Sequence, residues 1–542
     1  MKPRRFSVID IGTNSARFLA VEMCPDGSWR PIAERREPCR LGEGLSVDSV
    51  LGDAPMERAV AAVAAFVAAA AEVEAPIVRA VATHAVRRAR NREHFLSRVR
   101  ESAGIEVEAI APRVEGRLSY RAVTDLERSG ERARLERIGV LDTGGGSVQV
   151  TVGVGDVAVA SVSMPLGAVA ITEMFGGPEV SSGERFEELR EHIAAVVEGG
   201  LSRLPHAPRR LYGVGGGCTA AGELARLRAA GVLAPGGMPL NRPGRFRADI
   251  TIEEARELIR ALRPMGVAER AALPGLSVER SQIVVAGLAV LEAVLERLGG
   301  AGMTTLDVGL RDGLVIETAE QVRLRGAARS TATRLMLPCS AWALARRCRA
   351  EEPHSGHVAR LAQRLHAELV RLARAGQVRR GRWCRRRGAA ILNAAAVLHD
   401  SGICVSYKAH HKHSEEIIRF NGLYGVKHAV SDLVATVARY HRRAIPSRAH
   451  EAFGALDRKD RRLVRMLAGI LRVADGLDRS HRQVVDDVRV TVTEDSIVVT
   501  ASAEDEPRAE LLAARAKADL LARTLRRAVS VEWRGPASKS GA

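Results

Sequence analysis

Aromatic residues are scarce in this chain, at 3% of 542 residues, although apolar residues of all kinds make up 46%. An apolar share of that size is ordinary for globular domains, so the chain can bury hydrophobic cores. Most of the apolar residues are Ala, Val and Leu, which favours helices and buried sheet. The shortage of aromatic rings argues against surfaces that stack bases or sugars. We therefore expect no sequence-specific nucleic acid partner.

Paired cysteines are also lacking. The seven cysteines are scattered, odd in number and free of C-x-x-C pairs: Cys24, Cys39, Cys218, Cys339, Cys348, Cys384 and Cys404. Such spacing predicts neither a disulfide framework nor a zinc ribbon, and it suits a reducing compartment. The N-terminus enters a strand pattern without a signal-peptide core. The longest apolar stretch, 59–71, is too short to span a bilayer. We expect a cytoplasmic protein without a membrane partner.

Acidic residues are outnumbered, with 64 Asp and Glu against 82 Lys and Arg, which gives a formal net charge of +18. This excess predicts an anionic partner, and arginine grips phosphate through its planar fork. An Arg- and Ala-rich composition can equally reflect the nucleotide composition of the coding sequence, so charge alone leaves the partner open. The densest basic run, 371–387, fits either a solvated surface or a track for a long polyanion. Polyanion binding there would weaken steeply with salt.

Two segments share a pattern of strand, glycine turn and strand, at 6–22 and at 137–155. Between them the patterns predict a helix over 55–75, strands over 77–83 and 105–112, and a helix from about Val114. A third glycine turn follows another apolar strand and reads Gly213-Val-Gly215-Gly216-Gly217-Cys218. After about residue 325 the pattern becomes helical.

The two hairpin segments align as an internal repeat. Their turns are Asp10-x-Gly12-Thr13-Asn14-Ser15 and Asp142-x-Gly144-Gly145-Gly146-Ser147. Self-similarity separated by about a domain length predicts two related α/β halves, with a cleft between the two turns.

Consecutive glycines bring backbone N–H groups together without side chains in the way, which is what phosphate binding requires. Ser147 adds a hydroxyl donor, and Asp142 at the end of a strand is placed to hold Mg²⁺ against a phosphate. One such loop alone fits equally well a glycine-rich hairpin with a capping Asp. Two loops in the same register favour phosphate binding.

Seven segments occur in a distinctive order: VIDIGTNSARFLAVE, ATHAVRRARNREHFLSRV, VLDTGGGSVQV, MPLGAVAITEMF, GVGGGCTAAGELA, ERAALPGLSVERSQI and LDVGLRDGLV. This ordered set resembles the exopolyphosphatase/guanosine pentaphosphatase (Ppx/GppA) family, and the match covers residues 6–322 almost continuously. The resemblance implies an actin-like (ASKHA, ribonuclease H-like) ATPase fold. The same ordered set argues against a sugar kinase, which would use comparable loops to bind ATP.

The resemblance assigns roles to individual residues. Glu115, within IAPRVEGRLSYRAV, matches the catalytic glutamate, a base that orients or deprotonates water for in-line attack on a phosphoryl group. Without the resemblance, Glu115 would be interpreted as a solvated acid at a helix start. Arg87 matches an arginine that contacts phosphate, whereas Arg88 and Arg90 suit a solvated basic face. The expected phosphate-binding residues are Gly12, Thr13, Asn14, Ser15, Arg87, Gly144, Gly145, Gly146, Ser147, Gly215 and Gly216.

Two positions depart from the family pattern. Gln149 stands where the second loop usually ends in an acid, and Arg113 and Val114 replace acids before the catalytic glutamate. An amide can still accept a bond from a metal-bound water, but it lacks the negative charge that helps to hold Mg²⁺. We expect Asp142, Asp10 and, through water, Gln149 to hold Mg²⁺, with a weaker metal affinity or an altered substrate preference.

The helical C-terminal part carries histidines and aspartates in the order His354, His399-Asp400 and Asp475. This order, with KAHHKHS and ARYHRR between, resembles the HD-domain metal hydrolases. Imidazole and carboxylate together suit Mg²⁺ or another divalent ion. A set of residual histidines that pack or bind anions is the alternative. A hairpin over 487–502, a helix over 508–528 and a strand over 529–533 predict a small α+β cap.

The expected fold is α/β: two actin-like halves, 1–128 and 129–325, then a helical HD-type domain, 326–485, and a small α+β domain, 486–542. The expected activity is exopolyphosphatase, the Mg²⁺-assisted removal of terminal phosphates from inorganic polyphosphate. Guanosine pentaphosphate (pppGpp) 5'-phosphohydrolase activity is an alternative. Because of Gln149, a regulator that binds polyphosphate or nucleotides with weakened catalysis is another. The resemblance also implies a homodimer.

Overall fold

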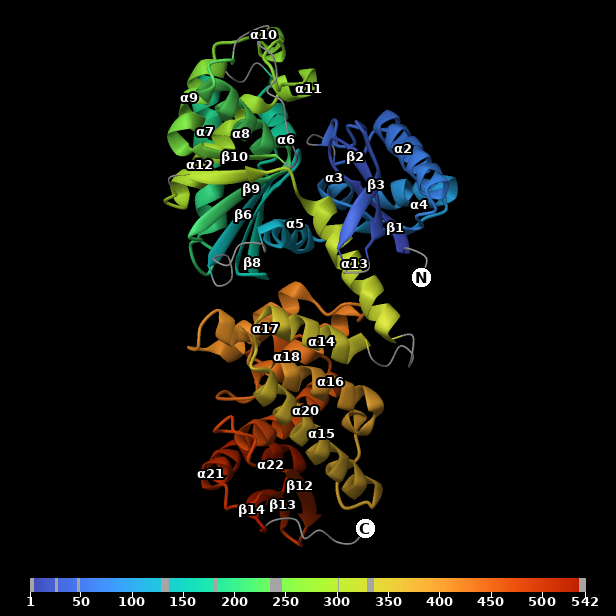
Figure 1. The fold of residues 1–542 in the computed structure, drawn as a ribbon, viewed down its shortest axis with the longest axis vertical. Coiled ribbons are helices and arrows are strands. Elements are labelled where there is room, and N and C mark those ends of the chain that lie inside the picture. Colours follow the sequence, from blue (N-terminus) through green and yellow to red (C-terminus); the bar gives the residue numbers. More distant parts are fainter. Residues whose placement is uncertain are drawn as a thin grey trace. The chain divides into compact units, whose positions relative to one another are not determined.

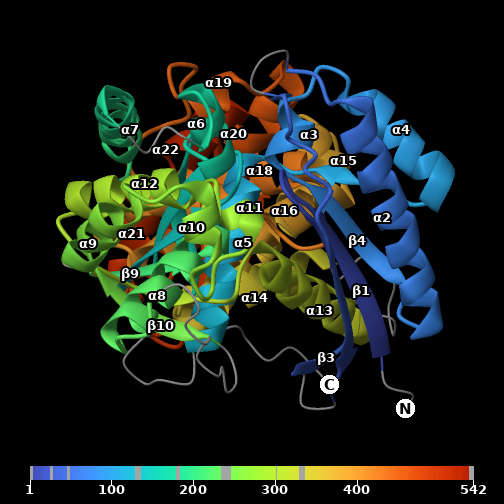
Figure 2. The same ribbon diagram turned by 90° about the horizontal axis from the view of Figure 1, so that it is seen from above.

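The computed structural model of the chain describes residues 4–24, 28–45, 49–127, 136–178, 183–233, 246–300, 302–328 and 336–535. The chain divides into two compact units, Met1–Arg323 and Leu324–Ala542 (Figures 1 and 2). The first unit holds two sheets with helices around them, and the second is mainly helical with one small sheet.

The first sheet has the strand order β3-β2-β1-β4-β5. Its strands are β1 Arg4–Ile11, β2 Ala16–Met23, β3 Trp29–Glu37, β4 Ile77–Ala82 and β5 Glu108–Ala109. β1 runs antiparallel to β2 and parallel to β4. The strand predicted over 105–112 is therefore wrong in length, because only two of its residues pair with β4.

The second sheet has the order β10-β11-β9-β6-β7-β8. Its strands are β6 Arg137–Thr143, β7 Val148–Val154, β8 Val157–Met164, β9 Arg210–Val214, β10 Arg247–Thr251 and β11 Gly302–Leu306. The run β8-β7-β6-β9-β11 has the same order and strand directions as β3-β2-β1-β4-β5 in the first sheet. The internal repeat in the sequence is thus a repeat of topology, with β1–β2 and β6–β7 as the equivalent hairpins.

Side chains of β1 alternate between two cores, as expected for a strand that is covered on both faces. Ile9 and Ile11 pack in a cluster with residues of α2 (Asp53–Glu72) and α4 (Arg92–Ala103). Phe6 and Val8 point the other way and pack with α5 (Pro112–Glu127) and α13 (Leu310–Ala328). Asp10 belongs to the face of Phe6 and Val8, because its position has the same parity. The first aspartate therefore lies on the side of the sheet that α5 covers.

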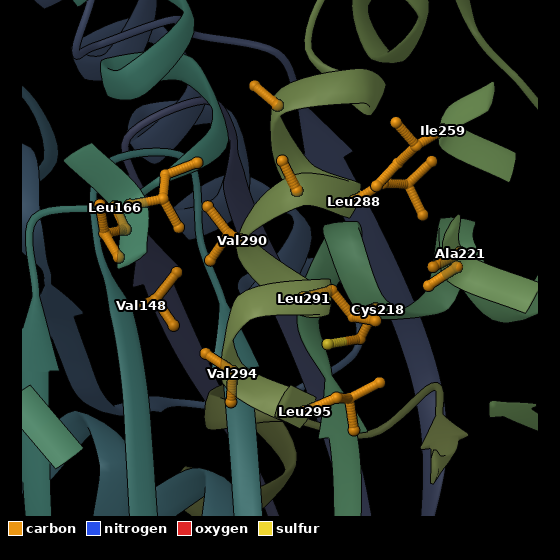
Figure 3. Packing of buried hydrophobic residues seen from close by; sticks show 14 of the residues in the cluster. Val148, Leu166, Cys218, Ala221, Ile259, Leu288, Val290, Leu291, Val294 and Leu295 are labelled. Carbon is orange, nitrogen blue, oxygen red and sulfur yellow. The ribbon is translucent and has the colours of Figure 1, made fainter. Parts of the chain in front are cut away.

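The second sheet has its own core, formed with helices α7 (Glu184–Leu201), α8 (Gly215–Ala229), α9 (Ile252–Leu262) and α12 (Val284–Arg297). Figure 3 shows Leu291 of α12 beside Cys218 of α8, with Leu295 one turn further along the helix. This core fixes the strands whose ends carry the second glycine turn and the third.

Helix α5 packs against both sheets. Leu118 belongs to the cluster on the first sheet, whereas a Cβ at Gly116 would overlap Thr151 Oγ1 and lie 2.5 Å from Ser161 Oγ in the second sheet. The Tyr120 hydroxyl donates to the Gly155 carbonyl over 2.8 Å. Only a glycine at 116 lets the helix approach the second sheet this closely. Glu115, in the first turn of α5, is thereby held between the two halves.

Ion pairs attach α13 to α5. Arg121 pairs with Glu320 at 3.3 Å, and both side chains are at most 10% exposed. Glu317, 3% exposed, pairs with Arg79 at 3.2 Å and also with Arg117. Because a buried charge left without its partner is costly, these pairs fix the position of α5 more than they add stability.

Helix α2 has 20 residues and, among the described residues, is long and apolar enough to cross a membrane by composition alone. The apolar stretch 59–71, taken above as too short to span a bilayer, is shorter than this helix. Val63 and Phe66 of α2 are fully buried, and Phe66 stacks on Phe18 with ring centroids 5.7 Å apart. This burial is that of a core helix.

The second unit contains the predicted terminal hairpin, β12 Asp487–Val492 with β13 Ser496–Ser502, and β14 Ala528–Trp533 pairs parallel to β13. The single helix predicted over 508–528 is wrong in its continuity, because the chain breaks into α21 (Arg508–Lys517) and α22 (Asp519–Leu525). Its other helices are α14 Met336–Arg347, α15 Glu352–Arg374, α16 Arg386–Leu398, α17 His410–Asn421, α18 His428–Arg439, α19 Glu451–Gly454 and α20 Arg458–Gly476, with 3₁₀ turns η4 Arg382–Cys384 and η5 Ser401–Cys404. All seven cysteines are free.

The contact between α13 and α5 makes a prediction about stability. A Cβ at Gly313 would overlap the Leu118 carbonyl oxygen and lie 2.5 Å from its carbon. Gly313→Ala should therefore destabilise the first unit by about 1–3 kcal/mol, as overpacking does. Gly199→Ala, also in a helix but with no atom within 4 Å of its Cβ, should be neutral or slightly stabilising. Scanning calorimetry of both variants measures their melting temperatures. Equal melting temperatures for Gly313→Ala and Gly199→Ala would contradict the tight contact.

Candidate active site

The two glycine turns have the same backbone geometry. In the first, Asp10 pairs with Arg17 across the hairpin, and the Gly12 amide donates to the Ser15 carbonyl over 3.1 Å. In the second, the equivalent pairs are Asp142 with Gln149 and the Gly144 amide with the Ser147 carbonyl, at 3.0 Å. Each turn thus presents an aspartate at the end of its strand and a closed loop beside it.

The remaining amides of both turns are available to a ligand. Within the described residues, none of these six backbone N–H groups donates a hydrogen bond: Thr13, Asn14, Ser15, Gly145, Gly146 and Ser147. The carbonyl sides are occupied, since Gly144 and Gly145 accept from the amides that begin α6 (Ala168–Met174), at 3.0–3.2 Å. Successive amides that point to one side form a nest for anions.

The two turns face each other closely. A Cβ at Gly146 would lie 2.9 Å from Thr13 Oγ1 and would overlap the ring of His84. A Cβ at Gly145 would lie 3.6 Å from the Cβ of Thr13. The glycines of the second turn therefore leave room for the first turn, and the nests of both halves converge.

His84 is a member of this site that the sequence analysis missed. It begins α3 (His84–Arg88), three residues before Arg87. Burial, together with the nearby guanidinium groups of Arg87 and Arg88, lowers the pKa of His84 to about 4. The ring is therefore neutral at pH 7.

The third glycine turn lies against the second. Gly215 opens α8 with φ +83°, and a Cβ there would lie 2.7 Å from Asp142 Oδ1. The Cys218 amide donates to Thr143 Oγ1 over 2.9 Å, while Gly216 has open space where a Cβ would stand. The positive end of α8 thus lies beside Asp142, where a phosphate would be favoured.

Glu115 lies at the meeting point of these groups. Arg87 Nη1 donates to Glu115 Oε2 over 3.2 Å and to the Ile110 carbonyl over 2.8 Å. Burial raises the pKa of Glu115 to about 7; the Arg87 guanidinium opposes this rise, and the Asp142 and Asp10 carboxylates add to it. Arg87, expected to contact phosphate, holds Glu115 in this structure. Arg88 and Arg90 are exposed.

Both aspartates are also affected by burial. It raises the pKa of Asp10 to about 6, against the opposing charges of Arg17 and Arg311. Burial likewise raises the pKa of Asp142, although the Ser119 hydroxyl donates to its Oδ2. Arg17 and Arg311 are site residues that the sequence motifs did not predict. The hairpin register places Arg17 opposite Asp10 and could have identified it.

Two oxygen atoms of this site fit a cation. Asp10 Oδ1 and Gln149 Oε1 are buried without a hydrogen-bond partner. The amide nitrogen of Gln149 is occupied, since it donates to Ser147 Oγ over 2.8 Å, so its oxygen is the free end. Carboxylate and amide oxygens without imidazole or thiolate are a donor set that suits Mg²⁺.

The second unit brings together the four residues expected to hold metal there. His354 Nε2, from α15, lies 3.8 Å from Asp400 Oδ2 and 3.9 Å from Asp475 Oδ1 of α20. His399 Nε2, just after α16, lies 3.7 Å from each of the same two oxygens. The Nε2 atoms of both rings are buried and lack a hydrogen-bond partner.

Three further residues join this cluster. His410 Nε2 lies 3.0 Å and His441 Nε2 3.5 Å from Asp400 Oδ1, and His354 Nδ1 lies 2.8 Å from Asp478 Oδ2. His413, one turn into α17, instead pairs with Glu416 at 3.3 Å. Of the histidines in KAHHKHS, the helical turn of α17 selects His410 as the one that reaches Asp400.

The basic run 371–387 faces solvent for most of its length. Arg379, Arg380 and Arg385 are exposed, while Trp383 is buried beneath them. Arg382 pairs with Asp460 at 3.1 Å. The run offers guanidinium groups to an anion outside the protein.

Comparison with known proteins gives consistent matches. The model of the Ppx/GppA phosphatase family matches residues 21–322, and that of Ppx/GppA phosphatase domain III matches residues 339–513. Exopolyphosphatase 1 of Mycobacterium tuberculosis is 29% identical over 320 residues, which are 58% of this chain and 87% of that protein. Exopolyphosphatase 1 of Mycobacterium leprae is 28% identical over 323 residues, 58% of this chain and 88% of that protein.

Solved structures show the same fold. An exopolyphosphatase from Cytophaga hutchinsonii superposes with a TM-score of 0.51 at 21% identity, covering 58% of this chain and 98% of that one. An exopolyphosphatase-like protein superposes with a TM-score of 0.52 at 24% identity, covering 60% of this chain and 100% of that one. With a family model that matches more than half of its length, the chain belongs to the Ppx/GppA phosphatase family and is a phosphoric anhydride hydrolase.

Proposed function

We propose that the first unit is an exopolyphosphatase, which releases terminal phosphates from inorganic polyphosphate. The observation that carries this proposal is the convergence of two amide nests on one glutamate between two aspartates. Nests of this kind bind phosphate through the backbone and need no base or sugar on the ligand. The similar mycobacterial proteins are named exopolyphosphatases, which favours polyphosphate over other phosphoric anhydrides as the substrate.

The chain's own groups account for each part of the reaction. The amides of Thr13, Asn14, Gly145 and Gly146 hold the terminal phosphoryl group and stabilise the charge on its oxygens. Glu115 accepts a proton from a water molecule aligned for in-line attack. When the terminal phosphoryl group binds, it competes with Glu115 for the Arg87 guanidinium. Arg87 then donates to the substrate instead of to Glu115.

Asp142, Asp10 and, through a water, Gln149 would hold Mg²⁺. The ion would supply positive charge beside the transferred phosphoryl group. Its charge would also lower the pKa of Asp10 and Glu115, which burial holds high.

The second unit has its own part in the proposal. We infer that His354, His399, Asp400 and Asp475 form an HD-type site for a divalent ion, supported by the two unpartnered ring nitrogens that face the carboxylates. The exposed basic run 371–387 gives a long polyanion a surface on which to dock.

The proposed organisation is the four-part chain 1–128, 129–325, 326–485 and 486–542, with the ribonuclease H-like halves followed by an HD-type domain and an α+β cap. Two sheets of the same topology support the first division. The proposed location is the cytoplasm, and free cysteines agree with it. A homodimer rests on family resemblance alone.

Phosphate release from polyphosphate and from guanosine pentaphosphate, measured side by side with and without Mg²⁺, tests the function. We expect turnover of polyphosphate that requires Mg²⁺. Glu115→Gln should reduce it by on the order of 10²–10⁴-fold, because the base is lost. Glu106→Gln, at an exposed acid paired with Arg100, is the matched control and should retain full activity.

Three outcomes would change the assignment. Faster turnover of guanosine pentaphosphate than of polyphosphate would identify that nucleotide as the substrate. Tight polyphosphate binding without turnover would make the chain a regulator. Normal turnover by a folded Glu115→Gln variant would remove Glu115 from the mechanism.

The pKa of Glu115 predicts the pH dependence. Glu115 must be deprotonated to act as a base, so activity should be present above its pKa and be lost as the pH falls through that value. This loss should occur near pH 7. It should move to lower pH when Mg²⁺ is bound. Arg87→Met removes a charge that lowers this pKa, so the acid limb should move to higher pH. Arg88→Met, at an exposed arginine, should leave the limb in place. An unchanged limb in Arg87→Met would contradict the coupling.

Gln149 predicts the metal requirement. Gln149→Glu places a carboxylate oxygen where Oε1 lies buried without a partner, and the Ser147 hydroxyl can then donate to it. The Mg²⁺ concentration for half-maximal activity should fall by about tenfold or more. Thr151→Ser, at the next inward position of the same strand, controls for general disturbance of β7. An unchanged Mg²⁺ requirement in Gln149→Glu would show that residue 149 does not act on the ion.

A further inference from the structure

The imidazole of His84 lies at the point where the two glycine turns meet. A Cβ built at Gly146 would overlap His84 Cδ2, and it would lie 2.9 Å from His84 Cγ and 2.9 Å from Thr13 Oγ1. The ring therefore packs on the second turn at the same place at which the first turn approaches it. None of the reaction steps proposed above uses this side chain.

The backbone around His84 is fixed to the strand that carries the first turn. Ala82, at the end of β4, is in register with Ile11 of β1. The Thr83 amide donates to the Ile11 carbonyl over 3.1 Å, and the Arg87 amide donates to the Thr83 carbonyl over 3.0 Å. Because Ile11 is the last residue of β1, the sheet itself sets the position of His84 relative to the first turn.

The ring has hydrogen-bonding groups that the protein does not use. Among the described residues, no side chain or backbone group forms a hydrogen bond with either nitrogen of His84. The side chain is half-buried and its nitrogens are not sealed in the core, which leaves them open to a ligand. Removing polar atoms from water without giving them a partner costs free energy. A ligand between the turns would supply the missing partner.

The charge state of His84 determines what it can offer to a phosphate. Burial, together with the guanidinium groups of Arg87 and Arg88, lowers the pKa of His84 to about 4. The neutral imidazole has one N–H donor and one acceptor nitrogen. An ionised phosphoryl oxygen only accepts hydrogen bonds, so it would take the N–H group.

Two roles fit this position. The ring could fill the space beside Gly146 and separate the turns, or it could donate to a ligand that is held between them. A phenylalanine or leucine side chain would fill the space equally well without placing two polar atoms there. The unpartnered nitrogens of His84 therefore favour the donor role.

We propose that His84 contacts the substrate, with its N–H group donating to an oxygen of the phosphoryl group between the two turns. This inference rests on the proposed function, which places that group against the amides of Thr13 and Gly146, and it adds a side-chain donor to these amides. His84 is attached to the first half, and its ring packs on the turn of the second half. The hydrogen bond thus joins both halves around one phosphoryl group. Because only the phosphoryl group is contacted, polyphosphate and guanosine pentaphosphate are affected alike.

Four variants of the full chain separate hydrogen bonding from space filling. His84→Phe keeps a ring and removes both nitrogens, and His84→Ala removes the ring. His84→Gln and His84→Asn return an amide N–H near the position of Nε2 or of Nδ1. The kcat/KM for phosphate release should fall by about 10–100-fold in His84→Phe and His84→Ala, because a hydrogen bond to a charged group is lost. One of the two amide variants should recover most of this loss.

The matched control is His94→Phe, which makes the same substitution at an exposed histidine of α4. This variant should retain full activity. Circular dichroism verifies that each variant is folded.

Binding of inorganic phosphate in the presence of Mg²⁺, measured by isothermal titration calorimetry, gives a second readout that does not require turnover. The Kd should rise by about 10–100-fold in His84→Phe and stay unchanged in His94→Phe. A wild-type chain that binds phosphate in this way but hydrolyses neither substrate would refute the proposed function and keep the role of His84.

Two results would overturn the inference. Wild-type activity and phosphate binding in a folded His84→Phe variant would show that the ring only fills space. An equal loss in all four variants at position 84, the amide variants included, would show that the shape of the imidazole matters and its N–H group does not.

Discussion

The close contact of α5 with both sheets is the constraint on which the active site depends. Gly116 allows the helix to touch β7 and β8, and Leu118 fills the core of the first sheet. Ion pairs from α13 hold the other side of α5. If α5 moved, Glu115 would leave the space between Asp10 and Asp142, and the Ser119 bond to Asp142 would break. Packing, rather than any local sequence signal, gives the glutamate its position.

Charge explains the rest of the site. Burial raises the pKa values of the three carboxyl groups. The Asp142 carboxylate adds to this rise at Asp10 and at Glu115. Arg17, Arg87 and Arg311 offset part of this cost. Two oxygens still lack a partner, at Asp10 and Gln149. In the proposed function, a cation would supply positive charge to these oxygens and a phosphate would accept from the amides of the two turns.

Much of the fold and of the candidate site could be predicted from the sequence, because local residue patterns encode the internal repeat. Strands, turns and their register follow from the alternation of apolar residues and from the positions of glycine, so Asp10 and Asp142 could be placed at equivalent strand ends. The order of His and Asp residues along the chain indicated His399 and Asp475. Contacts between distant segments could not be predicted. His84 approaches Gly146 only through tertiary packing. Only the turn of α17 determines that His410, and not His413, reaches Asp400. The break between α21 and α22 at Ala518 likewise has no marker such as Pro or Gly.

The central claim is that the turns at 12–15 and 144–147 hold a phosphoryl group between them while Glu115 orients or deprotonates the water. A crystal structure of the full-length Glu115→Gln variant soaked with a short polyphosphate tests this claim most directly. We expect the terminal phosphoryl group within hydrogen-bonding distance of the Thr13 and Gly146 amides, with residue 115 on the side of the attacking water. A polyphosphate end bound elsewhere, with both nests empty, would contradict it.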